Sequence, residues 1–190
     1  MKEFSSFIFN LACLEILRLD GCLELEILPK SIKKLRGLKV LTLTTTAMEL
    51  QGGIECLTSL QSLLIRDCKT LTSLPISLYL SRLIALHSLA IYSCKAFEFR
   101  EEDVGRNSNN LSLQKLRLEN LPKIKALSLP LLEGLTTNIN LHFLEIKHCR
   151  GLKELPNSLL EMDLDHIAIE KCSQLHSIPA GLSHLTSLKL

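Results

Sequence analysis

The chain has 190 residues, of which 46% are hydrophobic and 22% are charged. Its 22 basic and 20 acidic residues give a formal net charge of +2 and are spread along the sequence, so no basic stripe indicates a nucleic-acid-binding surface. The abundance of leucine and isoleucine excludes a chain disordered in bulk, and no apolar run reaches the roughly 18–20 residues of a transmembrane helix. We therefore expect a folded protein that binds neither nucleic acid nor membrane.

Residues 1–13 precede the regular part of the sequence. A secretory signal peptide needs a positively charged start and an unbroken apolar stretch. Here Lys2 is balanced by Glu3, and Ser5, Ser6 and Asn10 interrupt the apolar residues. We interpret this segment as the remnant of a preceding repeat or as an N-terminus created by truncation.

From residue 14 onward the chain repeats the pattern Leu-x-x-Leu-x-Leu-x-x-Cys-x-x-Leu-x-x-Leu-Pro. Four clear copies begin at Leu14, Leu60, Leu141 and Leu164. Three looser copies begin at Leu38, Leu86 and Leu113, and one truncated copy begins at Leu185. A period of roughly 20–29 residues with this pattern is the leucine-rich-repeat signature. Residues 14–190 are therefore predicted to form one leucine-rich-repeat domain of about seven repeats plus a truncated one.

The Leu-x-Leu core of each copy alternates apolar and variable residues, which is the period of a β-strand. The cores recur in one direction along the chain, so the strands must be parallel and joined by crossovers. Between them, apolar residues such as Ile32, Leu35 and Leu38 recur at every third position, which suits 3₁₀-like turns better than a full α-helix. The predicted fold is an α/β leucine-rich-repeat solenoid, a horseshoe with a concave parallel β-sheet and a convex side of irregular, 3₁₀ or short helical turns.

Three repeats depart from the pattern. The second has Thr46 where cysteine is expected, and the fifth has Leu121 there. The fourth carries a polar insertion over residues 98–110, which we expect to form an exposed loop. Such irregularity is typical of a natural array with tailored bends.

The seven cysteines are odd in number and lack the spacing of a secreted disulfide scaffold. Five of them share one repeat position: Cys22, Cys68, Cys94, Cys149 and Cys172. Stacking would place neighbours in this column about 4.8 Å apart, a spacing for which a disulfide and a metal site are the alternative interpretations. Side-by-side pairs do not supply four convergent ligands, and a thiol is easily buried. We therefore expect a ladder of buried thiols in a reducing compartment, with no metal and no cofactor.

Cysteine in place of the more usual asparagine, followed by x-x-Leu-x-x-Leu-Pro, resembles the C-terminal repeats of plant intracellular nucleotide-binding leucine-rich-repeat disease-resistance receptors. The likeness is clearest over residues 28–43, 67–75 and 171–179 and covers about residues 14–190. In that family the array senses pathogen effectors and holds the nucleotide-binding domain in its off state. The resemblance thus implies a cytoplasmic recognition and regulatory module of plant defence. The sequence contains no G-x-x-x-x-G-K-[ST] phosphate loop, so we expect no nucleotide binding.

The partners implied by this resemblance are proteins: a pathogen effector, a guarded host protein, or the nucleotide-binding domain of a parent receptor. Two other hypotheses stay open, a general leucine-rich-repeat scaffold outside immunity and the substrate-recognition part of a ubiquitin ligase. The latter needs a reactive cysteine, and only Cys13 and Cys56 lie off the cysteine column. No enzyme is expected, because the six histidines lack an H-E-x-x-H or G-x-S-x-G context. Three of them could approach one another on the sixth and seventh strands: His142, His148 and His166.

Variable strand positions should face the concave side and form its contact surface. In-register stacking predicts Arg117 beside Glu145, and Lys147 between Glu119 and Glu170. These charges either recognise a protein or merely form lateral ion pairs that contribute about 0–1 kcal/mol each.

A second group of side chains is a better candidate for a binding hot spot. Arg66 and Tyr92 lie on adjacent strands with Leu64 nearby, and Tyr and Arg are enriched in such spots. Phe143 precedes its Leu-x-Leu core and is placed on the same face. The candidate protein-contact residues are therefore Leu64, Arg66, Tyr92, Arg117, Glu119, Phe143, Glu145 and Lys147.

Overall fold

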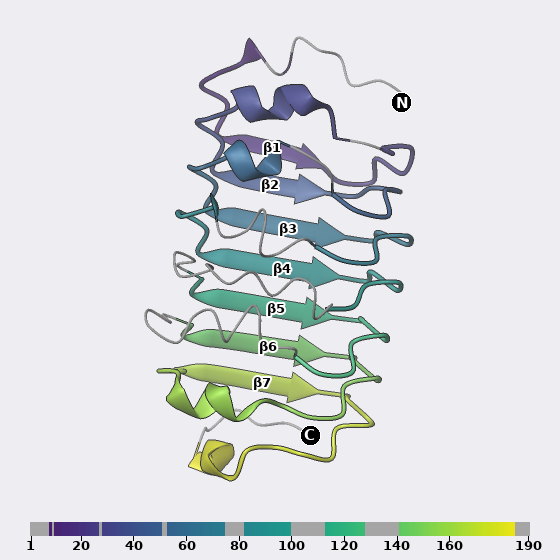
Figure 1. The fold of residues 1–190 in the computed structure, drawn as a ribbon, viewed down its shortest axis with the longest axis vertical. Helices are drawn as coiled ribbons and strands as arrows, with labels where there is room; N and C mark the ends of the chain where they lie inside the picture. The colour runs from purple at the N-terminus through teal and green to yellow at the C-terminus, as the bar shows by residue number, and fades with distance from the viewer. Residues whose placement is uncertain are drawn as a thin grey trace.

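The structure is a computed structural model that describes residues 8, 10–26, 28–50, 53–74, 82–99, 113–127 and 141–184. Within these residues the chain forms a stack of turns around one parallel sheet, whose spatial order follows the chain order (Figure 1). The seven strands are β1 (Ile16–Leu19), β2 (Val40–Leu43), β3 (Ser62–Arg66), β4 (Ser88–Tyr92), β5 (Lys115–Glu119), β6 (Phe143–Lys147) and β7 (His166–Glu170). The predicted parallel solenoid is confirmed.

The strands pair so that equivalent repeat positions lie beside one another. The first apolar residue of each Leu-x-Leu core aligns across all seven strands, from Leu17 in β1 to Ile167 in β7. These side chains are buried and join the apolar residues of the crossovers in one continuous core. Because each turn buries its leucines only against its neighbours, the stability of the stack is close to a sum over adjacent turns.

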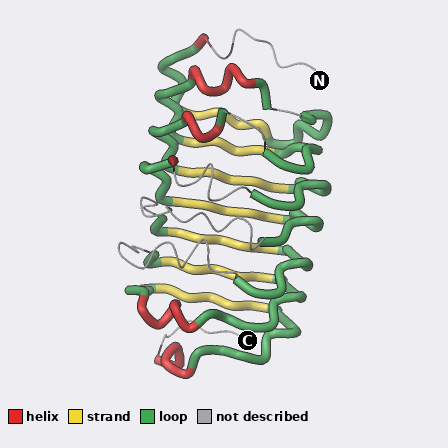
Figure 2. The backbone as a smooth tube through the Cα atoms, viewed as in Figure 1, coloured by secondary structure: helices red, strands yellow, loops and turns green. Residues whose placement is uncertain are grey.

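The crossovers between the strands carry short 3₁₀ helices, drawn in red in Figure 2. Those described are η2 (Lys30–Lys34), η3 (Ile54–Cys56), η6 (Asn157–Glu161) and η7 (Ala180–His184). Pro29 and Pro156 stand at the N-caps of η2 and η6 with φ of −66° and −75°, the range to which the proline ring restricts the backbone. The every-third-residue apolar period therefore predicted the helix type correctly.

A left-handed residue follows the strand in six of the seven turns. Gly21 has φ of 69°, and the equivalent non-glycine residues have φ of 54–56°: Asp67, Ser93, Asn120, His148 and Lys171. The N–H groups of Asp67, Ser93, Asn120 and His148 still donate hydrogen bonds to the next strand, as from Asp67 to the carbonyl of Tyr92 at 2.9 Å. This conformation turns the next side chain, usually a cysteine, into the core.

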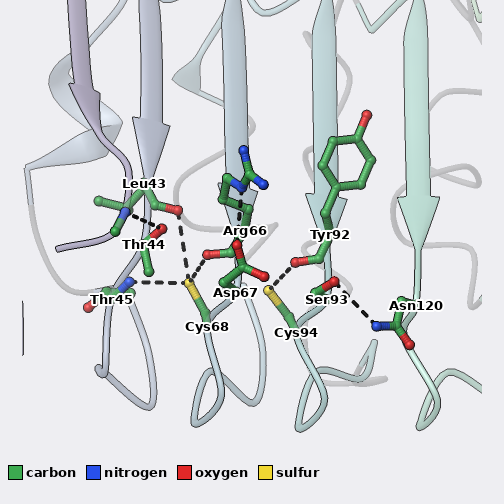
Figure 3. Close-up of polar contacts among 11 residues, drawn as sticks. Leu43, Thr44, Thr45, Arg66, Asp67, Cys68, Tyr92, Ser93, Cys94 and Asn120 are labelled. Atoms are coloured by element: carbon green, nitrogen blue, oxygen red, sulfur yellow. Dashed lines mark hydrogen bonds and ion pairs between the residues drawn. The ribbon is translucent and has the colours of Figure 1, made fainter. Parts of the chain in front are cut away.

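The cysteine column forms a ladder of thiols that connect neighbouring turns (Figure 3). The Sγ of Cys68 accepts the Thr45 N–H at 3.3 Å and donates to the Arg66 carbonyl at 3.3 Å. The Sγ of Cys149 lies 3.4 Å from the Lys147 carbonyl and 3.8 Å from the Leu118 carbonyl of the preceding turn. Cys68 and Cys149 thus act as small polar links between turns within an apolar interior.

The chemistry of these thiols follows from their burial. All seven cysteines are free, and Cys68, Cys94 and Cys149 are buried. Cys22 and Cys172, in the first and last described turns of the column, are only half-buried, which departs from the prediction that the whole column is buried. Burial raises the pKa of Cys149 to about 12, and the hydrogen bond to Cys68 together with burial raises the pKa of Cys94. Cys94 and Cys149 therefore stay protonated and unreactive at neutral pH, whereas the hydrogen bond with Cys94 lowers the pKa of Cys68.

Several predictions from the sequence fall outside the described residues. Most of the insertion at 98–110 and the truncated copy from Leu185 are among them. The two insertion residues that are described are not a uniformly exposed loop, because Phe99 is half-buried and packs edge-on against the buried Phe97 ring at 5.3 Å. The boundary at residues 13 and 14 stays a prediction. In the described part of the chain, no helix has the length and apolar character needed to cross a membrane.

The concave face as a candidate protein-binding surface

All eight predicted contact residues lie on the sheet face turned away from the core, which we call the concave face. Strand register places Leu64, Ala90, Arg117 and Glu145 in one row and Arg66, Tyr92, Glu119 and Lys147 in the next. Each is half-buried or exposed, except Ala90, while the alternating leucines of the same strands are buried. The predicted positions are therefore brought together on one surface over β3 to β6.

Glu145 is the centre of an ion-pair network over β5 to β7. Its carboxylate lies 3.4 Å from Arg117 Nε and 2.6 Å from Lys147 Nζ, and Lys147 also lies 3.7 Å from Glu170. The hydrogen bond to Glu145, with the charges of Glu145, Glu170 and Glu119, raises the pKa of Lys147. The charges of Arg117 and Lys147 are thus compensated by the protein's own carboxylates.

The predicted neighbours of Lys147 are confirmed in register but only partly in contact. Lys147 stands between Glu119 and Glu170 in the sheet, yet its shortest contact is to Glu145, two residues away on the same strand. Glu119 instead faces His148 Nδ1 at 3.8 Å. Register fixes which residues are adjacent, whereas the long side chains decide which of them meet.

An aromatic stack borders this network. Phe143 lies against the His166 ring with centroids 4.4 Å apart and planes 15° apart, and the Arg117 guanidinium carbon is 4.9 Å from the Phe143 centroid. Arg117 Nε is buried and has no hydrogen-bond partner, because its ion pair with Glu145 lacks hydrogen-bond geometry. His166 was missed among the candidates, although it holds the same first strand position as Phe143. That shared position was the signal in the sequence.

The surface over β2 to β4 carries few charges. Thr42, Leu64 and Ala90 form its middle row, and Ser62 and Ser88 lie beside them. Arg66 and Tyr92 border this surface as register partners (Figure 3), and Arg66 pairs with the adjacent Asp67 at 3.1 Å. Leu64, Arg66 and Tyr92 therefore form the cluster that the hot-spot prediction described.

The three histidines that could have formed a site have separate partners. The Nδ1 of His142 lies 2.9 Å from the Asp163 carbonyl, His148 faces Glu119, and His166 stacks on Phe143. Among the described residues, no group of three or more His, Cys, Asp or Glu side chains is arranged to hold a metal ion. These histidines are displayed on the surface as separate groups.

Residues 44–173 match the family model described as plant disease resistance protein RPS2-like, leucine-rich repeats. The chain belongs to this family. The matched range contains β3 to β7 and all eight candidate contact residues. The family predicted from the cysteine column and the following x-x-Leu-x-x-Leu-Pro pattern is thus confirmed.

Two curated relatives from Arabidopsis thaliana match nearly the whole chain. Disease resistance-like protein DSC1 is 25% identical over 98% of the chain, and Protein SUPPRESSOR OF npr1-1, CONSTITUTIVE 1 is 30% identical over 95% of it. The chain spans only 14% and 13% of the lengths of these relatives. It therefore corresponds to a leucine-rich-repeat portion of each.

Solved structures support the fold alone. The leucine-rich repeat domain of the type III effector XCV3220 (XopL) has a TM-score of 0.68 at 21% identity, with 96% of this chain and 69% of that chain covered. An internalin, inlF, from Listeria monocytogenes has a TM-score of 0.59 at 19% identity, with 98% and 57% covered. These structures share the leucine-rich-repeat architecture with the chain.

Proposed function

We propose that this chain is the recognition and regulatory module of a plant disease-resistance receptor, acting in the cytoplasm through protein binding and not through catalysis. The observation that supports it is the concave face, where eight candidate residues on four strands are displayed in register above a continuous apolar core. Membership in the family gives this surface its biological setting.

The two parts of the face suit different tasks. Leu64, Arg66 and Tyr92 offer apolar and aromatic area with a cation at its border, the composition that concentrates binding energy. Arg117, Glu145 and Lys147 form a fixed charge pattern, which favours partner choice and docking register over affinity. We assign contact energy to the first group and specificity to the second.

The partner proposed for this face is a pathogen effector, a guarded host protein or the nucleotide-binding domain of a parent receptor. One surface that binds the nucleotide-binding domain in the resting state and an effector on infection would couple recognition to release. Such coupling requires that the effector bind the released state more tightly than the resting state, and competition for shared residues of this face would supply that difference.

The test uses the double variant Arg66→Glu with Tyr92→Ala. A matched control, Arg36→Glu with Met48→Ala, makes the same charge change and also truncates an exposed side chain, off the concave face. Binding to a nucleotide-binding region of a related receptor, and to candidate effectors, is measured by co-immunoprecipitation from plant cells. Thermal unfolding of both variants checks the fold.

We expect the concave-face variant to weaken binding by about tenfold or more, since hot-spot truncations cost about 2 kcal/mol or above. The control should bind like the unmodified chain, and both variants should unfold at the unmodified temperature. If the folded concave-face variant keeps every interaction, the face is not the recognition surface.

A further inference from the structure

The turns that follow the strands carry opposite charge at the two ends of the stack. The turns after β1 and β2 hold four acidic residues and no basic one: Asp20, Glu24, Glu26 and Glu49. Those after β5, β6 and β7 hold Glu154 and five basic residues that we name the basic rim: Lys123, Lys125, Arg150, Lys153 and Lys171. The charges are evenly spread along the sequence, but the repeat sorts them along one edge of the molecule.

Backbone contacts place the turns of the basic rim directly on one another. The Lys153 N–H donates to the Lys125 carbonyl at 2.8 Å. A Cβ at Gly151 would lie 2.2 Å from the Pro122 carbonyl oxygen, so the turn that carries Arg150 rests on the turn that carries Lys123. The five cations are thus gathered over three adjacent turns, at the edge where the strand arrows end in Figure 1.

The cations of the basic rim differ from Arg117 and Lys147 of the concave face in having no carboxylate that compensates their charge. All five side chains are exposed, and within the described ranges none has a carboxylate at ion-pair distance. Arg117 and Lys147 on the concave face, by contrast, both pair with Glu145. An uncompensated cluster of one sign raises the local potential and attracts a partner of opposite sign.

The spacing of the rim favours one shape of partner. Adjacent turns lie about 4.8 Å apart, and an α-helix with one carboxylate per turn presents charges about 5.4 Å apart. The mismatch of about 0.6 Å per turn is within the reach of lysine side chains. An extended strand presents same-side residues about 6.6–6.8 Å apart and falls out of step over three turns.

The length of the rim argues against a long polyanion. A nucleic acid duplex or an anionic membrane that followed this edge would continue onto the turns after β1 and β2. There Asp20 and Glu26 are exposed and would repel it. A short acidic segment meets the cations without reaching these residues.

We propose that the basic rim binds an acidic α-helix of a protein partner, with about one carboxylate per helical turn facing the cations. This surface is distinct from the concave face and does not depend on it. Partner helices of this kind bind chiefly through charge, so their affinity falls as salt screens the interaction.

The experiment uses the 190-residue chain and a synthetic alanine-rich helix with one glutamate per turn along one face. Affinity is measured by fluorescence anisotropy for the unmodified chain and two triple variants. The rim variant is Lys123→Glu, Arg150→Glu and Lys153→Glu. The control, Lys30→Glu, Lys33→Glu and Lys34→Glu, makes the same net charge change at exposed residues of η2, on the crossover between β1 and β2.

The proposal predicts that the rim variant loses at least about tenfold in affinity for the helix and that the control loses less than about threefold. Raising NaCl from about 0.1 M to about 1 M, where the screening length falls from ~10 Å to ~3 Å, should abolish most of the binding. A peptide of the same composition made non-helical by prolines should bind more weakly. The variant Arg66→Glu with Tyr92→Ala should retain helix binding, which separates this test from that of the concave face.

Three results would overturn the proposal. The first is equal weakening by the rim and control variants. The second is equal affinity for the helical and the proline-broken peptide. The third is tighter binding to a DNA duplex, to phosphatidylserine vesicles or to a second copy of the chain, seen as dimerisation in sedimentation, than to the helix.

Discussion

The concave face is divided between a charge-poor surface over β2 to β4 and an ion-pair network over β5 to β7. Both halves have the same parallel backbone and the same register. They differ only in the displayed residues, one small set per strand. The comparison teaches that a repeat fold fixes the geometry of a surface and leaves its chemistry free, so neighbouring patches of one sheet can have unrelated roles.

Truncation of a core leucine should have the largest effect on the free energy of unfolding, and this effect should be the same in both halves. Leu63→Ala in β3 and Leu144→Ala in β6 each remove a fully buried side chain from the shared core, at a cost of about 2–5 kcal/mol. Chemical denaturation of the two variants measures this. A clear difference between them would show that the halves are not supported by one continuous core.

Substitutions at the left-handed position after the strand should have an intermediate effect on the free energy of unfolding. A non-glycine residue there costs about 1–2 kcal/mol, less for asparagine, whose side chain favours this conformation. Lys171→Gly should therefore stabilise the chain by up to about 1 kcal/mol, while Asn120→Gly should change stability little. Thermal melts of the two variants decide whether residue type governs this position; a destabilised Lys171→Gly would contradict it.

Removal of one charge should have a smaller effect on stability, confined to the half of the face with the ion-pair network over β5 to β7. Glu145→Gln leaves Lys147 and Arg117 without their shared carboxylate and should destabilise by at most about 1 kcal/mol, as expected for partly exposed pairs. Arg66→Gln, on the charge-poor half, should stay within about 0.5 kcal/mol of the unmodified chain. Equal losses for both substitutions would remove the energetic distinction between the halves.

The smallest effect is a pH dependence carried by Lys147. Its pKa is raised in the folded chain, first by the hydrogen bond to Glu145, so the contribution is fully present below the unfolded-state pKa. It is lost as pH rises through the folded-state pKa, above the ordinary lysine value near 10.4. The melting-temperature difference between the unmodified chain and Lys147→Met should persist near pH 7 and vanish at strongly alkaline pH. A difference that stayed constant would assign the effect to packing by the lysine stem.

Most of the scaffold was predictable because the repeat encodes it redundantly. Leucines at a fixed spacing indicate both the parallel strands and the 3₁₀ crossovers, and register then follows from aligning Leu63 with Leu89 or Leu144 with Ile167. The eight concave positions followed from the same alternation. The left-handed column was not predictable as a whole, because Ser93 and Lys171 are not residue types that typically signal this conformation.

Side-chain partners were predictable only where register alone decides them. Arg117 and Glu145 meet as neighbours in one row, as expected. The shorter Lys147–Glu145 contact and the Phe143–His166 stack depend on how the side chains lean, which spacing does not specify. The basic rim was not predicted for another reason. Its cations are far apart in the sequence, and only the stacking of turns brings them together.

The hydrogen bonds between strands run along the axis of the stack, so a force applied along that axis acts directly on them. A load pulling the two ends apart is carried by these bonds in series, so the turns would detach one after another instead of together. The turns differ in length, and the one from β5 to β6 is the longest, so each detachment would release its own length of chain. Pulled in an optical trap, the molecule would lengthen in unequal steps whose sizes identify the turn that has opened.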